Sequence, residues 1–150
     1  MSALANPSVI VIDANLSLAQ VLPLTYSPQT EVQMQRWAKE RVQIIVPVLW
    51  EYEMVSGLRR ACVNKILTPE RARQALHFLL EMRFEAVPGS PERHQRALEW
   101  AERLGQARAY DSQYLALAHE LGATLWTGDQ RLANGASQLG ILWVRWVGEA

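Results

Sequence analysis

Short apolar runs alternate with longer segments of helical spacing along this chain, and this alternation leaves few possible folds. Ser8–Ile12 reads S-V-I-V-I and Val42–Val46 reads V-Q-I-I-V, a pattern typical of strands that are buried on both faces. Ala123–Trp126 and Ile141–Val147 are similar runs, and Phe84–Val87 is a shorter candidate. Strands that alternate with helices predict an α/β fold with a central parallel sheet flanked by helices.

The segments between these runs carry the end signals of helices. Proline at Pro69 and Pro91 marks two helix starts, while Gly105 and Gly122 mark two helix ends. The expected helices are Ala14–Val21, Gln29–Arg41, Val48–Cys62, Pro69–Met82, Pro91–Leu104 and Asp111–Leu121, with a loop over Pro23–Pro28 and a turn at Gly128-Asp129. The 150 residues contain no repeat or linker, so residues 1–150 are expected to form a single domain.

Composition excludes several classes of protein. Fifteen Lys and Arg residues balance fifteen Asp and Glu residues, which argues against binding nucleic acid by bulk charge alone. The one cysteine, Cys62, rules out an intramolecular disulfide framework and a cysteine-based zinc site. No apolar stretch is long enough to span a membrane, and Met1–Pro7 lacks the features of a signal peptide. We therefore expect a cytoplasmic protein with no membrane contact.

Four acidic residues stand where a parallel sheet presents its ligand-binding edge. Asp13 directly follows the first strand, Glu53 lies two turns into the helix after the second strand, and Asp129 follows the Ala123–Trp126 strand. Asp111 begins the helix that leads into that strand, and the chain contains only these three aspartates. Ligands of such sheets bind beyond the carboxyl ends of the strands, so all four side chains can reach one edge.

Converging carboxylates repel one another unless a cation neutralises them. Mg²⁺ and Mn²⁺ suit such oxygen ligands, and a site of this kind can activate water for attack on a phosphodiester. Each acid also has a simpler interpretation taken singly. Asp13 and Asp111 could be helix N-caps, Asp129 a turn residue, and Glu53 a solvated helix residue.

Three stretches of the chain resemble the PIN-domain nucleases, and most closely the VapC-type toxin ribonucleases of toxin–antitoxin pairs. They are V-I-V-I-D-A-N at 9–15, P-V-L-W-E-Y-E-M-V-S-G-L at 47–58, and Y-D-S-Q-Y-L-A-L-A-H-E-L-G-A-T-L-W-T-G-D-Q-R-L at 110–132. The third stretch is the most specific, and the three follow the family's order over most of the chain.

The resemblance implies a PIN-like α/β/α fold and a metal-dependent endoribonuclease. It places the catalytic, metal-binding acids on Asp13, Glu53, Asp111 and Asp129, with Mg²⁺ or Mn²⁺ as the cofactor. Glu53 is preferred over Glu51 because the family's acid comes six residues after the proline, and Gly57, one turn on, would leave room beside Glu53. Thr127 and Asn15 would orient ligands or water from behind the acids.

The resemblance also implies partners: an RNA substrate, a cognate antitoxin protein and a second copy of the chain in a homodimer. The Gln29–Arg41 and Thr68–Met82 helices are the surfaces expected to make the protein contacts. The alternative is a catalytically silent PIN-fold module that acts by binding protein or RNA. Asn15 stands where an aspartate-nucleophile phosphatase would have a second acid, and no phosphate-binding glycine motif is present.

Arginines are the candidate phosphate ligands, because a guanidinium offers a fork of donors to phosphate oxygens. Those nearest the acids in sequence are Arg59, Arg60, Arg93, Arg96, Arg103, Arg108 and Arg131. Each could equally belong to a solvated helix face.

Overall fold

The computed structural model describes residues 9–107 and 109–149. Ser8 of the first expected strand, the Met1–Pro7 segment and Arg108 lie outside these residues. A five-stranded, fully parallel sheet in the order β3-β2-β1-β4-β5 forms the centre of the molecule. Its strands are β1 (Val9–Ile12), β2 (Gln43–Pro47), β3 (Glu85–Val87), β4 (Thr124–Thr127) and β5 (Val144–Trp146).

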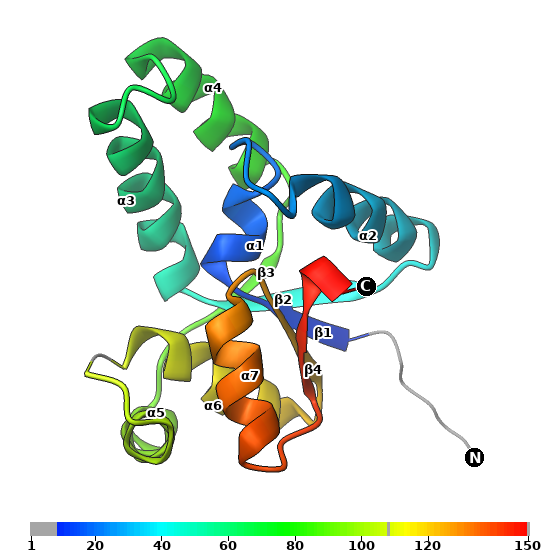
Figure 1. The fold of residues 1–150 in the computed structure, drawn as a ribbon, viewed down its shortest axis with the longest axis vertical. Coiled ribbons are helices and arrows are strands. Elements are labelled where there is room, and N and C mark those ends of the chain that lie inside the picture. The colour runs from blue at the N-terminus through cyan, green and yellow to red at the C-terminus, as the bar shows by residue number, and fades with distance from the viewer. Residues whose placement is uncertain (1–8, 108, 150) are drawn as a thin grey trace.

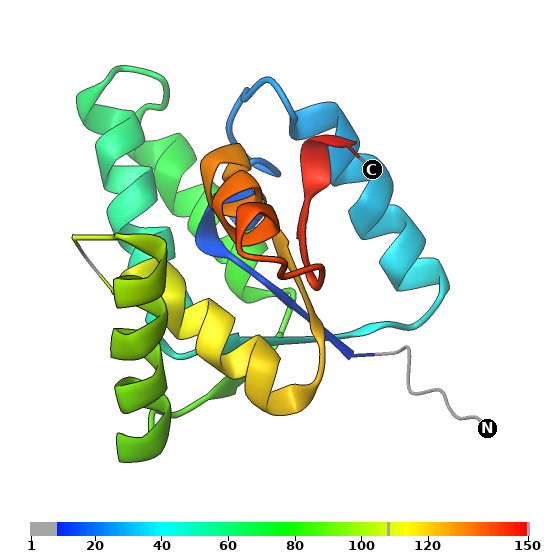
Figure 2. The same cartoon turned by 60° about the horizontal axis from the view of Figure 1, so that its bottom comes forward.

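Helices connect the strands and cover both faces of the sheet, which confirms the predicted α/β fold class. They are α1 (Ala14–Leu18), α2 (Ser27–Lys39), α3 (Leu49–Val63), α4 (Pro69–Leu80), α5 (Pro91–Leu104), α6 (Tyr110–Leu121) and α7 (Gln130–Gln138), followed by a short 3₁₀ turn at Val147–Glu149. Figure 1 shows α1 to α4 above the sheet and α5 to α7 below it, and Figure 2 shows α5 and α6 side by side.

The core lies between the sheet and these two layers of helices. Val11, Ile12 and Leu125 on the central strands are fully buried, which explains why their sequence runs show no polar alternation. Trp37 of α2 packs on Trp126 of β4 with ring centroids 5.5 Å apart. This contact lies one residue before the end of β4, close to the edge where Asp13 and Asp129 follow the two central strands.

One helix was not predicted from the sequence. Gln130–Gln138 forms α7, and Asp129 caps its start by accepting hydrogen bonds from the backbone N–H groups of Arg131 and Leu132. An aspartate before such a segment is a helix-start signal, so the interpretation as a simple turn was incomplete. The last strand is also shorter than the Ile141–Val147 run, and α2 begins inside the expected loop, at Ser27.

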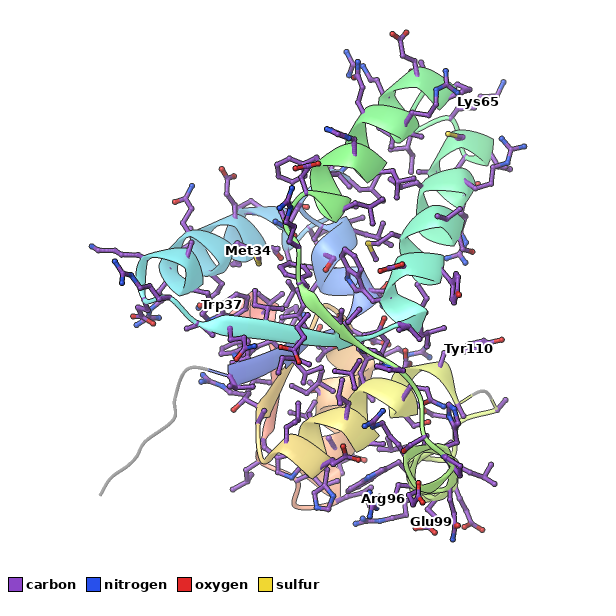
Figure 3. All side chains as sticks on the ribbon, turned by 180° about the vertical axis from the view of Figure 1, so that it is seen from behind. Met34, Trp37, Lys65, Arg96, Glu99 and Tyr110 are labelled. Atoms are coloured by element: carbon purple, nitrogen blue, oxygen red, sulfur yellow. The ribbon has the colours of Figure 1, made fainter. Side chains whose placement is uncertain are left out.

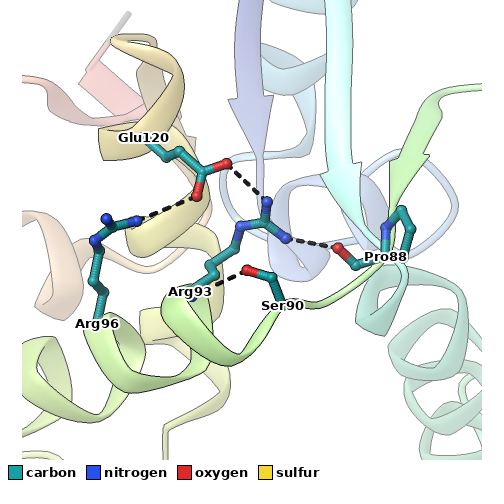
Figure 4. Close-up of polar contacts among 5 residues, drawn as sticks. All are labelled: Pro88, Ser90, Arg93, Arg96 and Glu120. Carbon is teal, nitrogen blue, oxygen red and sulfur yellow. Dashed lines mark hydrogen bonds and ion pairs between the residues drawn. The ribbon is translucent and has the colours of Figure 1, made fainter.

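Three of the candidate phosphate ligands have partners within the fold. Arg93 is buried, and its guanidinium donates to the Pro88 carbonyl at 2.7 Å and to Glu120 at 2.8 Å, while Arg96 reaches the other Glu120 oxygen at 3.4 Å (Figure 4). These contacts fix α5 against α6. Arg103 lies over the Trp100 ring, 4.4 Å from its centroid.

A pair of helices, α3 and α4, projects away from the sheet, and Lys65 lies at the tip of the connection between them (Figure 3). A largely apolar groove of about 1350 Å³ runs between α2 and α4, and Met34, Phe78 and Met82 are among its lining residues. Within the described part of the chain, no helix is long and apolar enough to cross a membrane.

Candidate active site

Asp13 is held at the carboxyl edge of the sheet by both neighbouring elements. Its backbone N–H donates to the Trp126 carbonyl at 3.2 Å, which continues the β1–β4 ladder past Ile12. Its Oδ1 accepts from the N–H groups of Leu16, at 2.9 Å, and Gly128, at 3.1 Å. Asp13 is therefore the N-cap of α1, as one interpretation predicted, and it also ties α1 to the turn after β4.

Thr127 connects two of the predicted acids. Its hydroxyl donates to Oδ2 of Asp13, and its oxygen accepts the backbone N–H of Asp129 at 2.8 Å. Thr127 is fully buried, so neither contact competes with bulk water. The register between β1 and β4 makes this possible, because it pairs Ile12 with Trp126 and brings the next residues of both strands level.

Glu53 reaches the same edge from α3. The buried Tyr114 of α6 donates its hydroxyl hydrogen to Oε1 of Glu53 at 2.6 Å, whereas Glu51 is exposed on another side of α3. The expected reason for Gly57 was wrong. A Cβ at this position would overlap the δ-methyl groups of Leu18, so the glycine permits the close approach of α1 to α3 and leaves no added space beside Glu53.

Burial and mutual repulsion disfavour the ionised forms of these acids. Burial raises the pKa of Asp13 to about 7, against the hydrogen bonds from Thr127, Leu16 and Gly128. Burial also raises the pKa of Glu53, and the nearby charge of Asp111 adds to the effect. The pKa of Asp111 is raised by burial and by Asp129. Asp111 is thus the acid that couples electrostatically to each of the other three.

The oxygen donor set fits a hard divalent cation. Asp13 uses about three of its roughly four acceptor positions within the protein, which leaves one for a ligand. In residues 9–107 and 109–149, no three His, Cys, Asp or Glu side chains stand close enough to hold a metal ion jointly. Mg²⁺ needs only one or two direct carboxylates and completes its shell with water, so the wider spacing is compatible with it.

The remaining interpretations have mixed outcomes. Asp111 is not an N-cap, because Ala109 occupies that position in α6 without a side-chain cap. Asn15 is exposed, and among the described residues its side chain makes no hydrogen bond to an acid. Its backbone carbonyl accepts a hydrogen bond from the Tyr26 hydroxyl at 3.4 Å.

Sequence reasoning missed two tyrosines at this edge. Tyr114 follows Asp111 by three residues in the same helix, a spacing that puts both on one face and could have revealed it. Tyr26 comes from the start of α2, where no local pattern connects it to the acids. Burial, Asp13 and Asp129 together raise the pKa of Tyr26 to about 12.

A parallel sheet with acids beyond its central strands, Asp13 buried and Asp129 half-buried, is the arrangement that the resemblance to the PIN class predicts. The PIN domain family matches residues 10–137, so the chain belongs to this family. The predicted membership is confirmed.

Individual relatives agree with this assignment. The chain is 38% identical over 88 residues to Ribonuclease VapC1 of Mycobacterium tuberculosis, in strains CDC 1551 / Oshkosh and ATCC 25618 / H37Rv. The match covers 58% of this chain and 63% of the relative, which is less than two thirds of its length. In fold, the chain is similar to PAE2754 from Pyrobaculum aerophilum, with a TM-score of 0.69 and 20% identity over 95% of this chain and 86% of the other.

Proposed function

We propose that the protein is a divalent-metal-dependent endoribonuclease and the toxin of a toxin–antitoxin pair. The observation that carries this proposal is the meeting of Asp13, Glu53, Asp111 and Asp129 at one edge of the sheet, where three of the four have raised pKa values. Such a site is unfavourable for the protein alone and favourable once a cation is bound. The similarity to a named ribonuclease supports RNA as the substrate.

The acids, Thr127 and Tyr114 have roles that their surroundings support. The four acids line the site that would hold Mg²⁺ or Mn²⁺, with one or two carboxylates on the ion and the others reaching it through water. The ion would supply an activated water and stabilise charge on the phosphate. Thr127 holds Asp13 and the Asp129 backbone in fixed relative positions. Tyr114 aims Glu53 at the same edge. The role of Asn15 in orienting ligands or water rests on the family resemblance alone.

Arg60 is the arginine best supported as a phosphate ligand. It lies two turns after Glu53 on α3, and its charge acts to lower the pKa of that carboxyl, so the two groups are close. Its side chain is exposed and therefore accessible to RNA. Arg93 is buried and engaged, and we exclude it from this role.

The groove between α2 and α4 supports the proposed antitoxin contact. Its lining is mostly apolar and includes residues of both helices that the family resemblance singled out. An apolar segment of an antitoxin would bury this surface. Homodimer formation and a single domain over residues 1–150 remain parts of the proposal that rest on the resemblance.

The first experiment compares cleavage of an end-labelled single-stranded RNA in Mn²⁺, Mg²⁺ and EDTA. The protein must be free of co-purified antitoxin. We expect cleavage that requires the metal, that Asp111→Asn and Glu53→Gln abolish, and that Glu51→Gln leaves unchanged. Equal cleavage by Asp111→Asn would reveal a contaminating nuclease. Absence of both cleavage and Mn²⁺ binding would favour the alternative, a PIN-fold module that acts only by binding.

A further inference from the structure

Tyr26 brings a hydroxyl group to the acid edge from an element that carries none of the acids. It is the N-cap residue of α2, and its ring packs against the hydrophobic core. The hydroxyl lies directly beside Gly128, because a Cβ on this glycine would be 2.7 Å from the phenolic oxygen. Gly128 stands between Thr127 and Asp129, so the hydroxyl lies against the turn that carries Asp129.

The fold makes little use of this hydroxyl. Among the described residues its one acceptor is the Asn15 carbonyl at 3.4 Å, which is longer than the usual 2.7–2.8 Å of an O–H···O bond. Tyr114 provides a contrast within the same site, because its hydroxyl donates to Glu53 at 2.6 Å. Packing alone would be served equally well by phenylalanine at position 26.

The chemistry of the hydroxyl suits an anionic ligand. The pKa of Tyr26 is raised by burial first and then by the charges of Asp13 and Asp129, so the phenol stays protonated and remains a donor at neutral pH. A lysine or arginine here would form an ion pair with these acids and compete with a bound cation. A phenol donates a hydrogen bond without adding a charge to the site.

We propose that the Tyr26 hydroxyl contacts the substrate by donating a hydrogen bond to a phosphate oxygen of an RNA strand that lies across the four acids. A phosphate is an acceptor only, and it occurs at every nucleotide, so the contact orients the strand whatever its sequence. This inference rests on the proposed ribonuclease function. It makes Tyr26 a substrate-binding residue in addition to the acids.

The test compares wild-type protein with Tyr26→Phe, which keeps the ring and removes the hydroxyl. With a single-stranded RNA and Mn²⁺ we expect KM to rise about tenfold, the change typical of one hydrogen bond to a charged group, with kcat nearly unchanged. The thermal midpoint and the Mn²⁺ affinity should stay the same, because the hydroxyl supports neither. Tyr52→Phe on the exposed side of α3 is the matched control and should change nothing.

An unchanged KM in Tyr26→Phe would overturn the proposal. So would a loss of Mn²⁺ affinity equal to the loss of activity, because the hydroxyl would then act on the cation site. Should the wild-type protein bind RNA in Mn²⁺ without cleaving it, the same tenfold difference is expected in Kd. The experiment therefore distinguishes a protein that does not hydrolyse RNA from one in which Tyr26 does not contact the RNA. Absence of any RNA binding would overturn both.

Discussion

The protein around Asp13 disfavours the ionised form of its carboxyl group. In the folded chain its pKa is raised from 3.8 to about 7, because burial outweighs three hydrogen bonds. The unfolded chain ionises this group near its ordinary pKa. Its contribution to stability is therefore complete below about pH 4 and is lost as the pH rises towards about 7. The raised pKa values of Glu53 and Asp111 act in the same direction.

We accordingly expect the metal-free protein in EDTA to unfold at a lower temperature at about pH 8 than at about pH 5, by roughly 4 °C or more. Thermal unfolding followed by circular dichroism measures this difference. Adding Mn²⁺ at the higher pH should restore the midpoint, since the cation binds the folded state. Asp13→Asn should show a smaller pH dependence. A midpoint that rises with pH to the same extent in both proteins would contradict the assignment.

Thr127 offers a second test at the scale of one residue. Thr127→Val keeps the shape of the side chain but leaves Oδ2 of Asp13 and the Asp129 N–H without their partner. Loss of a hydrogen bond that orients a metal-binding group typically weakens metal affinity by about 10–100-fold. Mn²⁺ titration by calorimetry measures this change. Thr127→Ser retains the hydroxyl and should recover most of the affinity; equal affinities for all three proteins would exclude the positioning role.

At the scale of elements, the site depends on how closely α1 approaches the turn between β4 and α7. A Cβ at Gly128 would lie 2.7 Å from the Tyr26 hydroxyl, 2.8 Å from the Leu16 nitrogen and 2.9 Å from the Asn15 carbonyl carbon. Two of these contacts are backbone atoms and cannot move independently of α1. Glycine at this position thus sets the separation of Asp13 from Asp129.

Gly128→Ala should destabilise the protein by about 1–3 kcal/mol, the usual cost of an added methyl group in a filled space, and should reduce Mn²⁺ affinity. Urea unfolding measures the first effect. Gly135→Ala is the control, and it should stabilise the protein. Its Cβ would meet only Leu104, at 3.7 Å, inside α7, where alanine is favoured over glycine by up to about 1 kcal/mol. Equal stability of the two variants would show that the close approach of α1 to Gly128 leaves room for a methyl group.

At the scale of the whole molecule, the groove and the acids are built from different parts of the chain. The groove is lined by residues of α2, of α4, of the 19–23 segment after α1 and of the starts of β2 and β3, whereas the acids lie beyond the carboxyl ends of the strands. Parallel strands point the same way, so the start of β2 and the acids lie at opposite edges of the sheet. Partner binding and RNA cleavage should therefore be separable by mutation.

Phe78→Asp should abolish binding of the proposed antitoxin and leave RNA cleavage by the free protein unchanged. Phe78 is half exposed and lines the groove, so a carboxylate there would oppose an apolar partner. Co-purification with the antitoxin and cleavage of single-stranded RNA measure the two properties. Leu98→Asp, on the exposed side of α5, is the matched control. Retention of the antitoxin by Phe78→Asp would place the contact elsewhere.

Local patterns along the chain were enough to predict the order and type of most helices and strands. The runs around Ile12, Val46 and Leu125 are apolar on both faces, and a fully buried parallel strand requires this. Pro69, Pro91, Gly105 and Gly122 mark helix ends by backbone geometry that depends on few distant contacts; Gly105 and Gly122 adopt φ values of 67° and 62°. Asp13, Asp111 and Asp129 were singled out because aspartates at strand ends and helix starts converge on one edge of a parallel sheet, and their role as site residues stays a prediction.

The contacts that these residues make could not be predicted from local patterns, because they join elements far apart in the chain. The links from Thr127 to Asp13 and from Tyr114 to Glu53 span 114 and 61 residues, and the position of Tyr26 beside Gly128 joins three separate elements. The same is true of Arg93. Its position in the sequence made it a candidate phosphate ligand, but in the fold it is buried and donates a hydrogen bond to Glu120. Periodicity records which side of an element is apolar. It does not record which polar groups meet across the sheet edge, because strand register and helix packing set those distances.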